Sequence, residues 1–122
     1  MKSGQQLWGR DRGGGPTLPA IGSEKVIFGD RFKIKALDSS SGEIEWATPV
    51  GGYTARPSIG GERVYVSVAS SAKEPAKLLS LNSETGQKMW ETSFGNVELT
   101  KPVVANSSVF VGTNSGAVYN YS

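Results

Sequence analysis

The chain has 122 residues, 16 of them glycine and six proline, and it contains neither cysteine nor histidine. The missing cysteines exclude disulfides and thiolate metal sites, and the missing histidines exclude the commonest general base and the Ser-His-Asp triad. The net charge of +2 comes without a basic run or stripe, so we expect no nucleic-acid binding. No apolar run approaches the roughly 18 residues of a membrane span, so no direct membrane insertion is expected.

From the N-terminus onward, the sequence predicts four short strands that recur three times in the same order. Each repeat has a tryptophan segment, a short segment that contains a proline, a run rich in β-branched residues, and a last strand. The tryptophan segments are 4–12, 42–50 and 86–94; the prolines are Pro19, Pro57 and Pro102; the β-branched runs are 26–29, 64–68 and 109–112; the last strands are 32–38, 77–82 and 117–122. Short runs of this composition between turn residues are typical of strands.

The repeat divides the chain into units of about 1–38, 39–82 and 83–122 within a single segment. The middle unit carries extra residues at 69–77, which read as an exposed loop between its last two strands. Five residues after each tryptophan stands a glycine, which predicts a turn because glycine reaches positive φ without steric cost; these are Gly13, Gly51 and Gly95. Four antiparallel strands in about 40 residues predict an all-β fold made of β-propeller blades.

One motif within the repeat has a fixed spacing: a polar residue, a glycine four residues later, and a tryptophan four residues beyond it. It runs Asp38, Gly42, Trp46 in one copy and Asn82, Gly86, Trp90 in the next, and the N-terminal copy keeps only Gly4 and Trp8. The polar side chain is suited to accept backbone N–H bonds in the turn. A tryptophan ring buries a large apolar area, and its N–H can reach a carbonyl. We therefore predict that these residues fasten neighbouring blades.

The pattern A-x-D-x-x-[ST]-G-x-x-x-W resembles the tryptophan-docking repeat of the pyrroloquinoline-quinone (PQQ) type propellers. Ala36, Asp38, Ser41, Gly42 and Trp46 match it fully, and the copy at 80–90 departs from it at Ser80 and Asn82. The resemblance covers essentially the whole chain. It implies a propeller in which each tryptophan lies between adjacent blades, and it places the chain closest to the non-enzymatic, BamB-like branch of the family.

Within that family, enzymes assemble a PQQ and calcium site from many blades, and several of them use neighbouring cysteines. Three units without cysteine do not match that set. The first hypothesis is thus a scaffold without catalytic activity or cofactor that binds a partner protein or peptide. The alternatives are a fragment of a quinoprotein dehydrogenase or sensor, and a carbohydrate-binding propeller. The resemblance favours a periplasmic or secreted location, by analogy alone.

Three blades fall short of the four to eight that closed propellers typically have. Two interpretations remain open. In one, two chains join head to tail as a six-bladed homodimer, because Ser122 followed by Met1 of a second copy keeps the repeat in phase, and "QQLW" then completes the last blade. In the other, the chain is a fragment of a longer propeller.

The strongest candidates for ligand binding are two cations that precede prolines at equivalent positions, Arg56 and Lys101. On the innermost strand of a propeller they would line the central channel and attract an acidic segment. The opposing interpretation is that a residue before proline must be extended, and that a long side chain tolerates this conformation.

Overall fold

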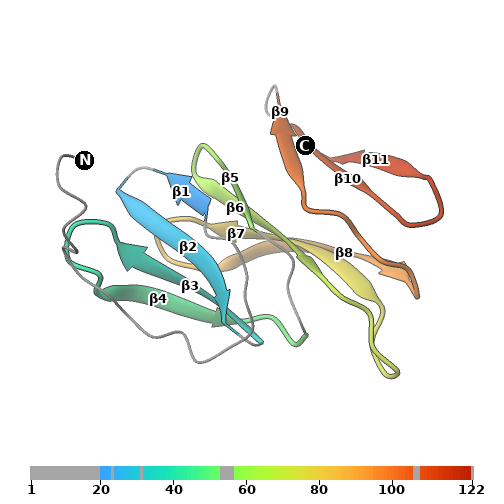
Figure 1. Cartoon of the computed structure of the whole chain (residues 1–122), viewed down its shortest axis with the longest axis horizontal. Helices are drawn as coiled ribbons and strands as arrows, with labels where there is room; N and C mark the ends of the chain where they lie inside the picture. The colour runs from blue at the N-terminus through green and yellow to red at the C-terminus, as the bar shows by residue number, and fades with distance from the viewer. Residues whose placement is uncertain (1–19, 23, 31, 53–56, 106–107, 122) are drawn as a thin grey trace, which may run out of the picture.

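The computed structural model describes residues 20–22, 24–30, 32–52, 57–105 and 108–121. Their strands form three antiparallel sheets that follow one another along the chain (Figure 1). The first sheet contains β1 (Ala20–Gly22), β2 (Lys25–Asp30), β3 (Lys33–Asp38) and β4 (Ile44–Pro49). The second contains β5 (Ser58–Gly60), β6 (Arg63–Val68), β7 (Ala76–Asn82) and β8 (Lys88–Gly95). The third contains β9 (Val103–Ala105), β10 (Ser108–Gly112) and β11 (Val118–Tyr121).

The sheets are offset from the sequence repeat by one strand. The tryptophan strand β4 hydrogen-bonds to β3, and β8 hydrogen-bonds to β7, so each of these strands completes the sheet formed by the preceding unit. In the third sheet, β11 has the position of β3 and β7, but among the described strands it pairs only with β10. The expected all-β architecture of four-stranded antiparallel blades is confirmed, and the third sheet has three strands within the described residues.

Two clusters of apolar side chains lie between the three sheets and pack them together. Between the first and second sheets, Ile27 and Ile34 pack with Val64 and Val66, all four fully buried. Between the second and third sheets lies a further cluster, built from Tyr65, Leu78, Val109 and Val111. Successive side chains of a strand point to opposite faces, so β6 serves both clusters. This explains why "VYVSV" does not alternate between buried apolar and exposed polar residues: β6 is buried on both faces.

The short inner strands lie side by side at one edge of the stack. β1 lies against β5, and β5 lies against β9, so these strands line a common hub (Figure 1). The outer strands β4 and β8 lie at the opposite edge of their sheets. Neighbouring sheets therefore meet along their whole width, from the hub strands to the tryptophan strands.

Two expectations about turns and loops have different outcomes. Gly51 and Gly95 have φ of +81° and +86°, as expected of turn glycines, while Gly13 lies outside the described residues. The extra loop of the middle unit is shorter than predicted, because β7 begins at Ala76, one residue before the predicted strand 77–82. Ala76 is fully buried and pairs with Gly95, so packing extends the strand into a segment that its sequence had assigned to a loop.

Candidate functional site

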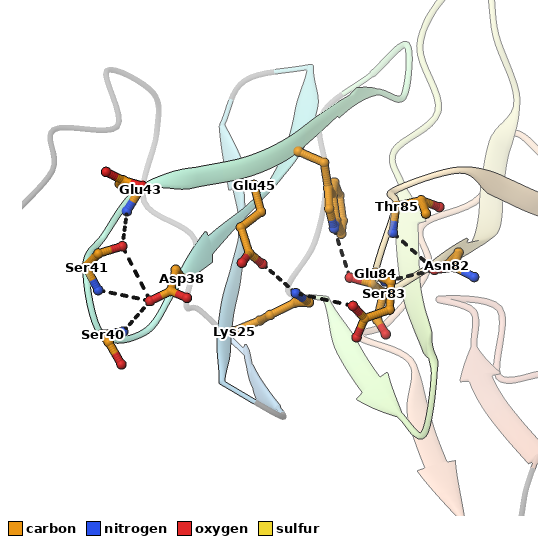
Figure 2. Close-up of polar contacts among 11 residues, drawn as sticks. Lys25, Asp38, Ser40, Ser41, Glu43, Glu45, Asn82, Ser83, Glu84 and Thr85 are labelled. Carbon is orange, nitrogen blue, oxygen red and sulfur yellow. Dashed lines mark hydrogen bonds and ion pairs between the residues drawn. The ribbon is translucent and has the colours of Figure 1, made fainter.

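The turns that precede the tryptophan strands share one hydrogen-bonding pattern. Asp38 Oδ1 accepts the backbone N–H groups of Ser40 at 2.8 Å and Ser41 at 3.0 Å. The amide oxygen Oδ1 of Asn82 accepts the corresponding N–H groups of Glu84 and Thr85 at 2.8 and 3.1 Å. Since both side chains offer the same acceptor, aspartate and asparagine are interchangeable in this turn. Figure 2 shows the two turns.

Each turn ends at a glycine in the left-handed region. Gly42 and Gly86 both have φ of +76°, and their N–H groups donate to the carbonyls of Asp38 and Asn82 at 2.8 Å. The hydrogen bonds from the Ser41 and Ser40 N–H groups hold the pKa of the Asp38 carboxyl below its ordinary value of 3.8. The turn thus favours the ionised carboxylate.

Trp46 lies on the turn of the neighbouring sheet. The residue is 8% exposed, and its Nε1 donates to the carbonyl oxygen of Ser83 at 2.9 Å. Gly86 faces the ring so closely that an added Cβ would lie 2.4 Å from Trp46 Cε3. Two residues after the tryptophan, Thr48 Oγ1 donates to the Gly86 carbonyl at 2.6 Å. Two side chains of β4 therefore satisfy carbonyl groups of the second sheet's turn.

A lysine connects the same two sheets beside the tryptophan. Lys25 of β2 forms an ion pair with Glu45 of β4, and its Nζ lies 3.8 Å from Glu84 Oε2 in the turn of the second sheet (Figure 2). The hydrogen bond to Glu45, opposed by partial burial, raises the pKa of Lys25 above its ordinary value. Lys25 is therefore cationic at neutral pH and attracts the carboxylate of the neighbouring turn.

The junction between the second and third sheets has a different composition. The hydroxyl of Ser58 donates to the Pro102 carbonyl, and Ser67 Oγ donates to the Thr100 carbonyl at 2.7 Å. Trp90, the counterpart of Trp46, is half-buried in an aromatic group rather than on a described turn. Its ring centroid lies 5.9 Å from that of Tyr121 and 6.3 Å from that of Tyr65, and Phe94 contacts Tyr119 and Tyr121 edge-on.

The structure does not place all the residues selected from the sequence. Trp8, Gly4 and Arg56 lie outside the described residues, so the pairing of Arg56 with Lys101 stays a prediction. Lys101 is exposed and precedes the buried Pro102, directly before β9. Sequence analysis missed Lys25 and Thr48 at the first junction. Thr48 carried a signal, because Trp-x-Thr recurs at 90–92, whereas nothing local connects Lys25 with Glu84.

Within the described ranges, no group of three or more acidic residues is arranged to hold a metal ion. Those ranges also contain no helix, and hence none long and apolar enough to cross a membrane. A cavity of about 140 Å³ lies between the end of β6 and the segment that precedes β9, lined by Ser67, Val68, Ala69, Glu98 and Leu99. It is smaller than the roughly 300–1,000 Å³ of typical ligand pockets.

Stacked antiparallel sheets, with inner strands at a hub and tryptophan strands at the rim, define a segment of a β-propeller. A solved propeller with this arrangement, BamB from Moraxella catarrhalis, superposes with a TM-score of 0.73 at 21% identity, covering 85% of this chain and 33% of that one. The chain belongs to the family of the outer membrane protein assembly factor BamB, whose family model matches residues 1–122.

A curated relative, outer membrane protein assembly factor BamB of Shewanella oneidensis, is 30% identical over 123 residues. The match covers 98% of this chain and 23% of that protein, so the chain spans about a quarter of its relative's length. A europium-containing methanol dehydrogenase also superposes, with a TM-score of 0.70 at 15% identity, over 84% of this chain and 22% of that one. At this identity, the likeness to the dehydrogenase is one of fold alone.

Proposed function

We propose that the chain is a non-catalytic propeller segment that binds a partner protein or peptide. Membership of a family named for an assembly factor supports this class of function. The observation that carries the proposal is the state of β11. β3 and β7, which have the same position in their sheets, each pair with two strands, whereas β11 pairs only with β10 among the described strands. Val118 and Tyr119 of β11 are 73% and 42% exposed. The partner is an extended segment that adds to β11 as a fourth strand.

In the finer form of this proposal, the added strand is residues 5–8 of a second copy. The tryptophan segment has this place in the other two sheets, where β4 adds to β3 and β8 adds to β7. Two chains joined in this way would form a six-bladed ring with two-fold symmetry. A longer propeller, in which further chain covers β11, is the competing arrangement.

Light scattering after size exclusion tests the ring. We expect a mass of about 25.8 kDa, twice the 12.9 kDa of one chain. A synthetic peptide of residues 1–10 should compete for β11 and shift the mass towards that of one chain, while a peptide of the same composition in scrambled order should not. A 12.9 kDa species with no affinity for the peptide would contradict strand addition by a second copy.

We also propose that Trp46, Gly86 and the Asn82 turn fasten the first sheet to the second. In a closed ring, the Asp38 turn would in the same way receive the tryptophan of the sheet that packs on the other face of the first sheet. The contact of Trp46 with the Ser83 carbonyl and the Gly86 backbone supports this role. The tryptophan is then structural and is not available to stack on a ligand.

For the hub, the proposal is that Lys101 and Arg56 attract an acidic segment of the partner. The exposure of Lys101 next to β9 supports it. Exchanging Lys101 for glutamate should weaken binding of an acidic peptide and reduce its salt dependence, because Arg56 remains. Exchanging Lys73, an exposed residue of the 69–75 loop, is the matched control.

Carbohydrate binding is a second candidate, because Phe94, Tyr119 and Tyr121 form an aromatic group at the edge of the stack. Aromatic faces of this kind suit the apolar face of a sugar ring, and a glycan array with a Tyr119→Ala variant tests this function. Quinoprotein chemistry has only the fold likeness in its support. Addition of PQQ and calcium, followed by absorbance, tests it. The family's name favours an extracytoplasmic location.

A further inference from the structure

The hub strands contact one another through a repeated knob-and-seat arrangement. A Cβ added at Gly22 of β1 would lie 2.9 Å from Ile59 Cγ2 of β5. In the same way, a Cβ added at Gly60 of β5 would lie 2.5 Å from Val104 Cγ1 of β9. Each glycine is therefore a seat that receives a branched side chain from the next sheet, and the contact recurs at both junctions of the chain.

Strand register identifies a third seat and a third knob. Gly22, Gly60 and Ala105 each end an inner strand and pair with the first residue of the next strand, which places them at one equivalent position. One residue earlier stand Ile21, Ile59 and Val104, which are the knobs. Ile59 and Val104 are partly buried because they pack against the sheet that precedes their own, but Ile21 is 76% exposed. Ala105 is likewise exposed.

The face of the third sheet around Ala105 is apolar and open within the described residues. Val103 is 58% exposed and Val118 is 73% exposed. By register, Val118 corresponds to Ile34 of β3 and Leu78 of β7, which are both 0% exposed because the next sheet covers them. The face of the third sheet therefore continues the interface that the first two sheets present to their neighbours.

We propose that a second copy of this chain covers this face and that its Ile21 packs on Ala105. The knob lies on the first sheet of one copy and its seat on the third sheet of the other, so the contact is heterologous. It would stack the two copies in the same way as neighbouring sheets stack within one chain. Ala105 carries a Cβ that the two glycines lack, so the arriving side chain lies farther from the backbone than Ile59 or Val104 does. This inference rests on the homodimeric form of the proposed function, and it names the contact that forms at the hub.

Disulfide trapping tests the contact directly, because the natural chain contains no cysteine. In the double variant Ile21→Cys/Ala105→Cys, mild oxidation with diamide should join different copies. A closed two-chain ring gives one band at twice the chain mass on a non-reducing gel, and reduction reverses it. The single variants Ile21→Cys and Ala105→Cys are controls. Their cysteines lie far apart in a heterologous ring, so they should stay monomeric on the gel.

A matched pair within the chain calibrates the geometry. In the Gly60→Cys/Val104→Cys variant, the two Cβ atoms stand about 3.3 Å apart, close to the roughly 3.5–4.5 Å of a disulfide. This variant should close within one chain, so that the band stays at the chain mass and the intact mass falls by two hydrogens. It shows that trapping works at a seat of this kind.

A variant without cysteine gives an independent readout. Ile21→Glu places a charge on an exposed knob, so the fold should survive while the population of 25.8 kDa species falls at least tenfold at a fixed chain concentration. Met89→Glu, at a residue that is 44% exposed on the middle sheet, should leave the mass unchanged.

The outcomes separate this inference from the function it rests on. If the natural chain is a dimer but Ile21→Cys/Ala105→Cys is not trapped while the calibration pair closes, the knob contact is wrong and dimerisation stands. If the natural chain is a monomer and the double variant is not trapped, both the contact between Ile21 and Ala105 and the proposed homodimer are wrong. Trapping of the single variants as efficiently as the double variant would also overturn the contact.

Discussion

Replacing Gly86 by alanine would insert a methyl group between the Asn82 turn and the Trp46 ring. At φ of +76°, an L-residue costs about 1–2 kcal/mol. The new Cβ would also lie 2.4 Å from Trp46 Cε3 and 2.6 Å from Thr48 Oγ1. Overpacking of this kind typically costs about 1–3 kcal/mol. We therefore expect the free energy of unfolding to fall by about 2–5 kcal/mol, a large part of the roughly 5–15 kcal/mol of a typical domain.

Gly95 offers a matched control for the backbone contribution. Its φ is +86°, and a Cβ added there would meet nothing within 4 Å. Gly95→Ala should therefore cost only the conformational part, about 1–2 kcal/mol. Urea denaturation, monitored by tryptophan fluorescence, gives both free energies of unfolding. If the dependence of this free energy on urea concentration is the same in the two variants, both expose the same surface on unfolding. If Gly86→Ala costs no more than Gly95→Ala, the close packing of Trp46 on the turn does not stabilise the protein, and the fastening proposal fails.

Three further substitutions test the same structure. Trp46→Phe leaves the buried Ser83 carbonyl without its donor and should lower the free energy of unfolding by about 1–3 kcal/mol, measured by circular dichroism in urea; no change would mean that water replaces the indole N–H. Asp38→Asn should keep the turn, as Asn82 does, but remove its acid sensitivity. Because the folded-state pKa of Asp38 is lowered, its ionised form stabilises the protein above the ordinary value of 3.8, and this contribution is lost as the pH falls through the lower folded-state pKa. The stability difference between Asp38 and the variant should therefore shrink in acid, and a difference that stays constant would argue against the carboxylate. Glu24→Gly relieves a φ of +61° at an exposed hairpin residue and should raise the free energy of unfolding by about 0.5–1 kcal/mol, whereas a lower thermal midpoint would contradict this account.

The features that could be predicted from the sequence are those that depend on neighbouring residues. The turn at Asp38 needs an acceptor, two N–H groups within three residues and a glycine at the end, so its spacing appears directly in the sequence. Strand composition and turn glycines likewise act over a few residues. These local features sufficed for the propeller class and for the tryptophan motif as the candidate site.

The contacts of that site were beyond sequence reasoning. Trp46 donates to a carbonyl 37 residues away, and Lys25 pairs with Glu84 of another sheet. No local spacing connects such residues, because their distance depends on how two sheets pack face to face. The end of β7 is similar: burial of Ala76 draws into the strand a residue whose sequence context favours a loop.

The sequence by itself determined the repeat, the order of strands and the family, since each follows from patterns within about 40 residues. Only the tertiary structure decided which faces are covered. Ile27 and Ile34 are fully buried by the second sheet, while Ile21, six residues before Ile27, is 76% exposed on the other side of the stack. The same residue type is buried or exposed according to whether a further sheet lies over it. The exposed faces of this propeller segment therefore follow from its position in the stack.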